Sequence, residues 1–347
     1  MNSTERVHAA LRLEQPDRVP VVEFVIDDKV ARGAVPGCRD VADCMDRLDM
    51  DGVGCGARFE KVSENLDGSY VDEWGVTYMA NTEVVAHPIR GPISTLADAK
   101  AYTTPTPDAP HRLGPLPDLV SRYKGKRAIC FHHRAAFMWS AYLMGIDSIL
   151  MNFLAEPDTV EVTMDKVLEC NMAIVRRAIH TGAEVIILGD DYASNLGPMM
   201  SPAIFAHFIL PRLKKMIDMI HDEGAFCVKH TDGNIYSILD MIVSAGPDAL
   251  NPIEPLAGME LKKVKQLVGE QVCLMGNIDC GQLLPHGTAG EVRQAVRQAI
   301  ADAGSGGGYI VSSSNSFHSS CQPGNLVAMV EAVKRFGRYP LGSFGAA

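Results

Sequence analysis

Short apolar runs rich in valine and isoleucine alternate with longer segments of helical periodicity from about residue 125 to the end of the chain. This order is typical of β–α units that build a parallel sheet. Helices are predicted over Ala203–His221, which Ser201 and Pro202 would open as N-cap and first helical residue, and over Ala289–Ala303. Six strands are predicted in this part of the chain: Arg127–His133, Glu184–Asp191, Ala225–Asp232, Ala249–Glu254, Val272–Asp279 and Tyr309–Asn315.

Two further strands, Val19–Val25 and Asp51–Gly56, are predicted upstream. Eight strands that alternate with helices predict a closed (β/α)8 TIM barrel of the α/β class, one domain over residues 1–347. An open doubly wound sheet is the alternative, but no Gly-x-Gly-x-x-Gly motif follows the first strand. The alternating stretch Tyr70–Pro88 predicts a small antiparallel excursion between the second and third strands.

The composition excludes several classes of protein. Hydrophobic residues make up 47% and charged residues 21%, which indicates a soluble globular protein with a large core. The 32 Lys+Arg against 42 Asp+Glu give a net charge of −10, which argues against nucleic acid or an anionic membrane as partner. The nine cysteines include no Cys-x-x-Cys pair, and the N-terminus has early charges and no apolar run. A cytoplasmic location is therefore expected.

Polar side chains gather where the predicted strands end. The carboxyl ends of barrel strands converge on one mouth, where catalytic groups sit. For a single carboxylate, a helix N-cap or an ion pair is the simpler interpretation, but six polar strand ends together favour an active site at this rim. These ends are His132-His133, Asp190-Asp191, His230-Thr231-Asp232, Glu254, Asn277-Ile278-Asp279 and Ser312-Ser313-Ser314-Asn315.

Strand alternation indicates which of these groups act together. Period two places His230 and Asp232 on the same strand face. They are therefore candidates for paired metal ligands or for a histidine oriented by a carboxylate. For the helix after His133, an apolar ligand wall and ordinary core packing remain equally open. The candidate substrate contacts are His133, Trp139, Tyr192, Asn234 and Asn315.

These motifs resemble the uroporphyrinogen decarboxylase-like superfamily, in its branch of cobamide-dependent methyltransferases. The resemblance covers nearly the whole chain and implies a (β/α)8 barrel, in agreement with the strand count. It is carried by segments that agree in order and spacing: Glu5-Arg6-Val7, Gln15-Pro16-Asp17-Arg18-Val19-Pro20, His230-Thr231-Asp232-Gly233-Asn234, Asn251-Pro252-Ile253-Glu254-Pro255, Gly276-Asn277-Ile278-Asp279, Pro323-Gly324-Asn325 and Gly337-Arg338-Tyr339-Pro340.

Two departures narrow what the resemblance implies. The decarboxylase proper binds the carboxylates of its substrate with arginines after the first strand, whereas this region reads Glu23-Phe24-Val25-Ile26-Asp27-Asp28-Lys29 and is acidic. Repulsion of a porphyrinogen is therefore expected. The thiol-methylating enzymes hold zinc with His-x-Cys and a later cysteine, but Asp232 and Asn315 stand at those positions.

What remains resembles the donor-side enzymes, the first component of an O-demethylase, which move a methyl group onto the cobalt of a partner corrinoid protein. The implied donor is a small methoxylated molecule, with methoxylated aromatics the expected class. The chain has no Asp-x-His-x-x-Gly corrinoid signature, so the cobalamin is expected to arrive on the partner. A homodimer is an open alternative to a monomer.

The expected chemistry is assistance to a poor leaving group. A phenolate, whose conjugate acid has a pKa of about 10, leaves a methyl ether slowly, and a proton or a metal at the oxygen would help it leave. As a hypothesis, His230, Asp232 and Glu254 bind a zinc ion there. The metal-free alternative uses a protonated Asp191 or Asp279 as general acid.

Three other functions stay open at this stage. The first is a decarboxylase or other lyase acting on a carboxylic acid, which arginines at the mouth would favour; the strand-end candidates are Arg58 and Arg134. The second is a methylcobamide:thiol methyltransferase, which zinc bound by cysteines would favour. The third is a binding protein without catalysis, which the many titratable groups at the rim argue against.

Overall fold

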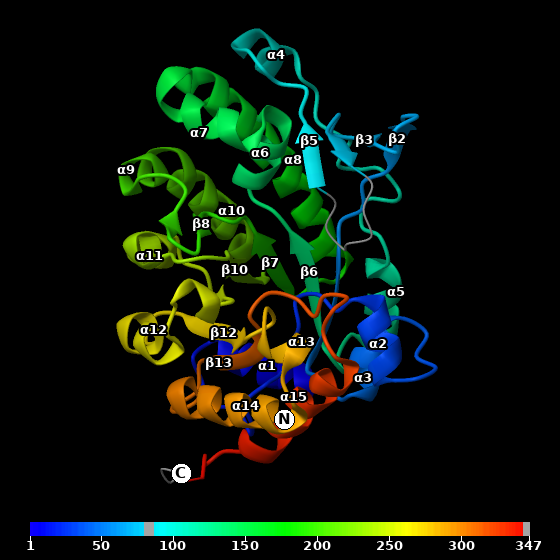
Figure 1. Ribbon diagram of the computed structural model, residues 1–347, viewed down its shortest axis with the longest axis vertical. Coiled ribbons are helices and arrows are strands. Elements are labelled where there is room, and N and C mark those ends of the chain that lie inside the picture. Colours follow the sequence, from blue (N-terminus) through cyan, green and yellow to red (C-terminus); the bar gives the residue numbers. More distant parts are fainter. Residues whose placement is uncertain (80–86, 343–347) are drawn as a thin grey trace.

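The computed structural model describes residues 1–79 and 87–342. Its centre is a parallel sheet of seven strands in the order β1-β6-β7-β10-β11-β12-β13 (Figure 1). The α/β class predicted from the sequence is confirmed, and all seven strands lie within predicted ranges. The strands are β1 (Gly52–Gly56), β6 (Ala128–His133), β7 (Val185–Gly189), β10 (Phe226–His230), β11 (Ala249–Asn251), β12 (Cys273–Ile278) and β13 (Tyr309–Ser313).

The remaining predicted strand, Val19–Val25, is present only as an isolated bridge at Val21. Val21 pairs in parallel with Val311 of β13, and the N–H of Val22 donates to the carbonyl of Val311 at 3.1 Å. On the other side, the N–H of Asp51 donates to the carbonyl of Val21 at 2.8 Å, so this segment connects the two edges of the sheet. Pro20 has no N–H to give to a ladder, which is one reason why no regular strand forms here.

Helices follow the strands, as the β–α pattern predicts. The helix predicted over Ala289–Ala303 is found with those bounds, and Ser201 caps the turn that Pro202 begins. The helical elements are α1 (Ser3–Leu11), α2 (Asp28–Ala34), α3 (Val41–Arg47), α4 (Leu96–Ala101), α5 (Leu116–Tyr123), α6 (Phe137–Met144), α7 (Ile146–Ala155), α8 (Pro157–Thr181), α9 (Pro202–Ile204), η1 (Phe205–Ile209), α10 (Leu210–Asp222), η2 (Tyr236–Ile238), α11 (Leu239–Ser244), η3 (Pro255–Ala257), α12 (Leu261–Val268), α13 (Leu283–His286), α14 (Ala289–Ala303) and α15 (Pro323–Phe336).

The predicted antiparallel excursion lies between β1 and β6. Its four strands are β2 (Lys61–Glu64), β3 (Tyr70–Asp72), β4 (Thr77–Met79) and β5 (His87–Arg90), paired in that order, and they project to one side of the molecule in Figure 1. Residues 80–86 of the predicted stretch lie outside the described residues. A further hairpin, β8 (Ala193–Ser194) and β9 (Gly197–Pro198), follows β7.

The two faces of the curled sheet carry two separate apolar clusters, an inner one and an outer one. The inner cluster contains Ala128, Val185, Val228 and Ala249, together with Val7 of α1, so α1 closes the amino-terminal end of the sheet. The outer cluster packs the remaining strand positions against the helices. Side chains alternate between these two faces along each strand. The last inward-facing residue of each strand therefore lies at the carboxyl end of the sheet, away from α1.

The helices α6 and α7 are the most apolar pair. Their buried residues include Phe137 and Leu143 of α6 and Ile149 and Phe153 of α7. Within residues 1–79 and 87–342, no single helix is long and apolar enough to cross a membrane. Taken together, α6 and α7 meet that criterion by length and composition, but they meet at a bend of 99°.

Candidate active site

A polar layer covers the inner cluster at the carboxyl ends of the strands. Each residue of this layer comes two positions after an apolar residue of the inner cluster. These apolar residues are Cys130, Val228, Ala249 and Ile310. Since alternate residues share a strand face, the layer points into the mouth. It consists of His132 from β6, His230 from β10, Asn251 from β11 and Ser312 from β13.

The ring of His230 is held by two contacts. Its Nδ1 lies 2.5 Å from Oδ1 of Asn251, whose Nδ2 donates to the carbonyl of Met275 at 3.0 Å. Because the amide nitrogen is used in this way, its oxygen must accept, so Nδ1 of His230 carries the proton. Phe24 stacks on the imidazole with ring centroids 4.5 Å apart.

The other nitrogen, Nε2 of His230, faces two carboxylates. It lies 3.5 Å from Oδ1 of Asp232 and 3.8 Å from Oδ1 of Asp191. A neutral imidazole would direct the Nε2 lone pair at these oxygens, which is unfavourable, whereas a proton or a metal ion on Nε2 makes the contact attractive. The ligand atoms of Asp191, His230 and Asp232 all lie within 4.8 Å of one another, close enough to hold one metal ion.

Asp232 is the most perturbed carboxyl of this cluster. Burial raises the pKa of Asp232 to about 6. The interaction with His230 lowers this pKa, and the negative charges of Asp191 and Glu254 raise it further. Asn315 donates to Oδ2 of Asp232, and Asp191 accepts from the N–H of Asp232 at 3.2 Å. Among the described residues, Oδ1 of Asp232 is buried without a hydrogen-bond partner. The structure therefore brings Asp232 and Asn315 together, the two positions at which the thiol-methylating enzymes that the sequence resembles have zinc-binding cysteines.

Glu254 lies outside this group of ligand atoms. Its Oε2 accepts from the N–H of Gly233 at 2.7 Å, and Asp191 takes the third place in the cluster. Gly233 has a φ of +85°, and a Cβ there would meet the carbonyl carbon of Ala193 at 2.6 Å, so the loop that follows β10 requires glycine at this point.

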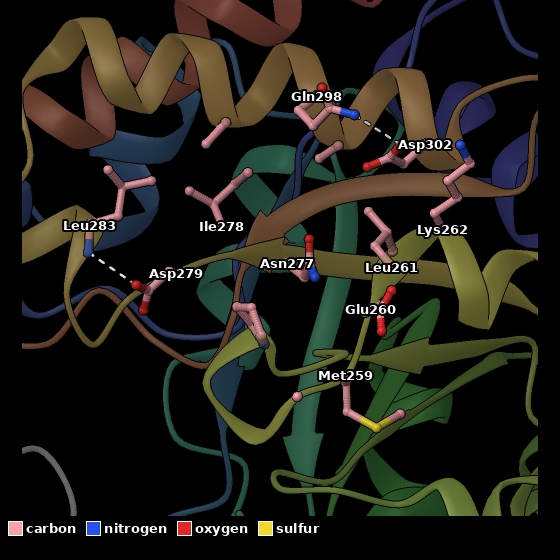
Figure 2. A pocket seen from close by; sticks show the side chains of 14 residues that line it. Met259, Glu260, Leu261, Lys262, Asn277, Ile278, Asp279, Leu283, Gln298 and Asp302 are labelled. Carbon is pink, nitrogen blue, oxygen red and sulfur yellow. Dashed lines mark hydrogen bonds between the residues drawn. The ribbon is translucent and has the colours of Figure 1, made fainter.

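Asp279 also lies apart from the cluster. Its carboxylate accepts from the N–H groups of Gly281 at 2.7 Å and Leu283 at 3.2 Å, the arrangement of a turn cap. It lines a groove of about 600 Å³ together with Asn277 and Gln298. In Figure 2, Asn277 lies in the middle of this groove and Gln298 of α14 lies above it. For Asp279, the structure thus favours the simpler interpretation of a cap.

The candidate substrate contacts divide between the rim and the core. Asn315 touches Asp232 at the rim. The other four candidates have contacts away from the cluster. His133 forms a hydrogen bond with Asn171 at 3.0 Å, and Tyr192 packs on Phe205. In the same way, Trp139 stacks on Trp74 at 4.6 Å, and Asn234 donates to the carbonyl of Ala257 at 3.1 Å.

Several residues at the mouth were not among the predicted contacts. His132 is one, since it points inward where His133 points outward; alternation counted from Ala128 would have identified it. Burial lowers the pKa of His132 to about 3, and its Nε2 has no partner among the described residues. Phe24 lies between the two inward histidines, with its ring centroid 4.8 Å from that of His132. Both residues therefore belong to the wall of the mouth.

Arg134, a candidate from the sequence, follows β6 at the same rim. It is half-buried, and its guanidinium donates to the hydroxyl of Tyr142 at 3.2 Å. Burial opposes its charge, but Tyr142, Asp191 and Asp190 together raise its pKa. The other candidate, Arg58, is exposed. Of these two candidate arginines, Arg134 is therefore the one whose charge interacts with the acidic cluster.

Glu23 leads to a prediction about pH. Burial raises its pKa from the usual 4.5 to about 7, against two hydrogen bonds from Ser313 that favour the charged form. The folded protein thus binds this proton more tightly than the unfolded chain, so the free energy of unfolding falls as the pH rises from about 4.5 through about 7. Glu23→Gln should remove this fall, which is on the order of 3 kcal/mol.

Urea denaturation at pH 5 and pH 8 measures this effect. The variant should gain stability over the wild type at pH 8 and not at pH 5. Glu331→Gln is the control, because Glu331 is exposed and its pair with Arg293 lies on the surface. An unchanged pH dependence in Glu23→Gln would show that Glu23 ionises freely in the folded protein.

The fold and the cluster together define a class, an α/β enzyme with a parallel, barrel-like sheet and an acid–imidazole site at the carboxyl ends of its strands. The chain belongs to the uroporphyrinogen decarboxylase (URO-D) family, whose model matches residues 75–336. The family membership predicted from the sequence is confirmed. This membership supports an enzyme and does not by itself identify the reaction.

Individual relatives are distant. The chain is 24% identical over 256 residues to uroporphyrinogen decarboxylase of Pseudoalteromonas translucida, covering 71% of this chain and 70% of the relative. It is also 24% identical over 255 residues to the enzyme of the same name from Aeromonas salmonicida, covering 70% and 69%. Among solved structures, a methyltransferase from Methanosarcina mazei has the same fold, with a TM-score of 0.77 and 20% identity over 97% of this chain and 99% of that one.

Proposed function

We propose that this protein is a methyltransferase that moves a methyl group from a small methoxylated, most simply aromatic, donor to the cobalt of a partner corrinoid protein. The observation that carries the proposal is the convergence of Asp191, His230 and Asp232, within 4.8 Å of one another, beside the ring of Phe24. Reduced cobalt is itself a strong nucleophile, so the protein needs to assist only the leaving oxygen. An acid–imidazole cluster is suited to that task.

The chain's own residues orient and charge this cluster. Asn251 fixes the His230 ring so that Nε2 faces the donor oxygen, and Phe24 covers one face of the imidazole and limits access of water. If His230 is protonated at Nε2, it can donate that proton to the leaving phenolate, stabilised until then by Asp191 and Asp232. The raised pKa of Asp232, about 6, makes it a second group able to hold a proton near neutral pH.

The same residues fit a zinc ion. One imidazole nitrogen and two carboxylate oxygens are a donor set that zinc accepts, and Oδ1 of Asp232 is buried without a partner in the described parts of the chain. Asp191, His230 and Asp232 would hold the ion, with Asp191 in the place first predicted for Glu254. When bound, zinc supplies Lewis-acid stabilisation of negative charge on the leaving oxygen.

Metal removal is expected to abolish methyl transfer. Dialysis against a chelator should reduce the rate to background, and one equivalent of zinc should restore it, because the carboxylates alone cannot neutralise a phenolate. Metal content measured by atomic emission should fall and rise in parallel. Full activity of the metal-free protein would instead identify His230 or Asp232 as the general acid.

Large apolar side chains are exposed on segments that follow the strands, and we propose that the partner docks against them. Leu196 is 97% exposed in the β8–β9 hairpin, Leu154 of α7 is 80% exposed, and Leu256 after β11 is 48% exposed. Large apolar side chains left in water are typical of interaction surfaces when they share one face. A corrinoid protein is the partner that this reaction requires.

The second candidate function is a decarboxylase or related lyase. Arg134 favours it, because within the described residues no carboxylate oxygen lies within 4.0 Å of this guanidinium, which leaves it free to bind a substrate carboxylate. The names of the curated relatives point in the same direction. A methylcobamide:thiol methyltransferase is a third candidate. The argument against it is that Asp232 and Asn315 stand where such enzymes have zinc-binding cysteines.

Product identification separates these functions. The purified protein is incubated without oxygen with methoxyarenes and cob(I)alamin, with methylcobalamin and a thiol, or with aromatic and porphyrinogen carboxylic acids. We expect methylcobalamin in the first mixture only. Methylated thiol in the second would move the enzyme to the acceptor side, and carbon dioxide in the third would establish the lyase.

A further inference from the structure

Lys229 is a fully buried lysine directly before His230. Strand alternation places it on the outer face of β10, where its Nζ lies 4.4 Å from the ring centroid of Tyr192. Its ammonium donates to three main-chain carbonyls: Leu188 at 3.3 Å, Asp190 at 2.7 Å and His230. Three acceptors use all three N–H bonds of the ammonium, which a buried charge requires.

The carbonyls that Lys229 binds belong to the peptide units that present the candidate ligands. The oxygen of Asp190 shares a rigid peptide plane with the nitrogen of Asp191, and the oxygen of His230 lies in the plane that leads toward Asp232. One ammonium thus holds the ends of β7 and β10 together. A shift of either plane would move a carboxylate relative to Nε2 of His230, where the present distances are 3.5 Å and 3.8 Å.

We infer that Lys229 is a positioning residue, which sets the geometry of Asp191 and Asp232 around His230 by fixing the strand ends from behind the site. It does not face the donor and has no role as an acid or base. The nearby Asp190 carboxylate has a separate task, because it accepts from the N–H groups of Ala136, Phe137 and Met138 at the start of α6. The inference deepens the proposed function and rests on it where activity is the readout.

The chain contains a matched control. Lys265 on α12 also donates to three main-chain carbonyls, those of Gly307 at 3.0 Å, Gly308 at 3.1 Å and Gly269 at 3.5 Å. Gly307 and Gly308 precede β13, so this lysine lies at the opposite end of the sheet from the cluster. A variant of Lys265 therefore loses similar hydrogen bonds without touching the site.

The test compares Lys229→Met with Lys265→Met and with Lys229→Arg, which keeps a charge and donors. Cobalt(II) serves as the probe: its affinity is titrated and its visible absorption spectrum reports the ligand geometry. Lys229→Met should weaken binding roughly 10- to 100-fold, the usual cost of losing a residue that orients metal ligands, and should change the spectrum. Methyl transfer should lose kcat at a nearly constant KM. Lys265→Met should match the wild type in both, and Lys229→Arg should lie between.

A crystal structure of Lys229→Met measures the same point without any metal or donor. The distances from His230 to Asp191 and Asp232 should change. Unchanged distances together with wild-type cobalt affinity would overturn the inference. If the wild type binds no cobalt, the metal part of the proposed function fails, and the crystal structure still decides the role of Lys229. If Lys229→Met does not fold, Lys229→Arg carries the same comparison against Lys265→Met.

Discussion

His230→Ala is expected to lower the rate of methyl transfer by at least about 10²- to 10³-fold, the range seen when a group that stabilises developing charge is removed. Nε2 of His230 is the nitrogen that faces Asp191 and Asp232, so without it neither a proton nor a metal can be held between the three groups. Rates are measured from the appearance of methylcobalamin. The variant should keep its circular dichroism spectrum, since the ring ends the inner cluster rather than filling it.

The control for His230 is a histidine with the same kind of partner at the other end of the molecule. Nε2 of His221 lies 2.8 Å from Oδ2 of Asp248, which precedes β11. His221→Ala also removes an imidazole next to a carboxylate, but far from the cluster, and should leave the rate unchanged. If His230→Ala retained activity, His230 would have no role in the chemistry. If His221→Ala were equally inactive, the loss would reflect general destabilisation.

Asp51→Ala is expected to lower the free energy of unfolding by about 3 to 5 kcal/mol. The Asp51 carboxylate is fully buried and binds two arginines, Arg6 at 2.6 Å and Arg18 at 2.7 Å, as well as the N–H of Val21 at 2.9 Å. Without it, two guanidinium groups stay partly buried with too few anionic partners. The bond to Val21 also joins β1 to the segment that connects the two edges of the sheet.

Urea denaturation at neutral pH measures the loss at Asp51. The matched control is Asp28→Ala, which removes an exposed ion pair with Arg32 one helical turn away and should cost at most about 1 kcal/mol. A cost at Asp51 similar to that at Asp28 would mean that Arg6 and Arg18 find other partners in the variant. The segment around Val21 would then be held to the sheet mainly by β13.

The sequence was sufficient to predict the parallel α/β architecture, because its signals are local. The helix over Ala289–Ala303 has its predicted bounds since Thr288 and Glu291 form a reciprocal cap at its start. The segment Val19–Val25 has the composition of a strand, but its pairing depends on partners at both ends of the chain. No local pattern in the sequence predicts that this segment forms only an isolated bridge.

The candidate site could be predicted only in part. The spacing of His230 and Asp232 placed both on one side of a strand, and the structure brings them together. The place of Asp191 depends on the parallel pairing of β7 with β10, which sequence spacing does not specify. Glu254 accepts a hydrogen bond from the N–H of Gly233, which the sequence does not predict. Nothing in the sequence distinguishes Lys229 from other polar strand residues, because its role depends on the carbonyls around it.

A single-turnover experiment tests the central claim most directly. The protein is mixed without oxygen with stoichiometric cob(I)alamin and an aromatic donor whose methoxy carbon is 13C-labelled, and both products are quantified by NMR and absorbance. The proposed function predicts labelled methylcobalamin and demethylated phenol in equal amounts, formed only when protein, donor and cobalt are all present. Cobalt that stays unmethylated, while the protein releases carbon dioxide from a carboxylic acid, would contradict methyl transfer and establish a decarboxylase.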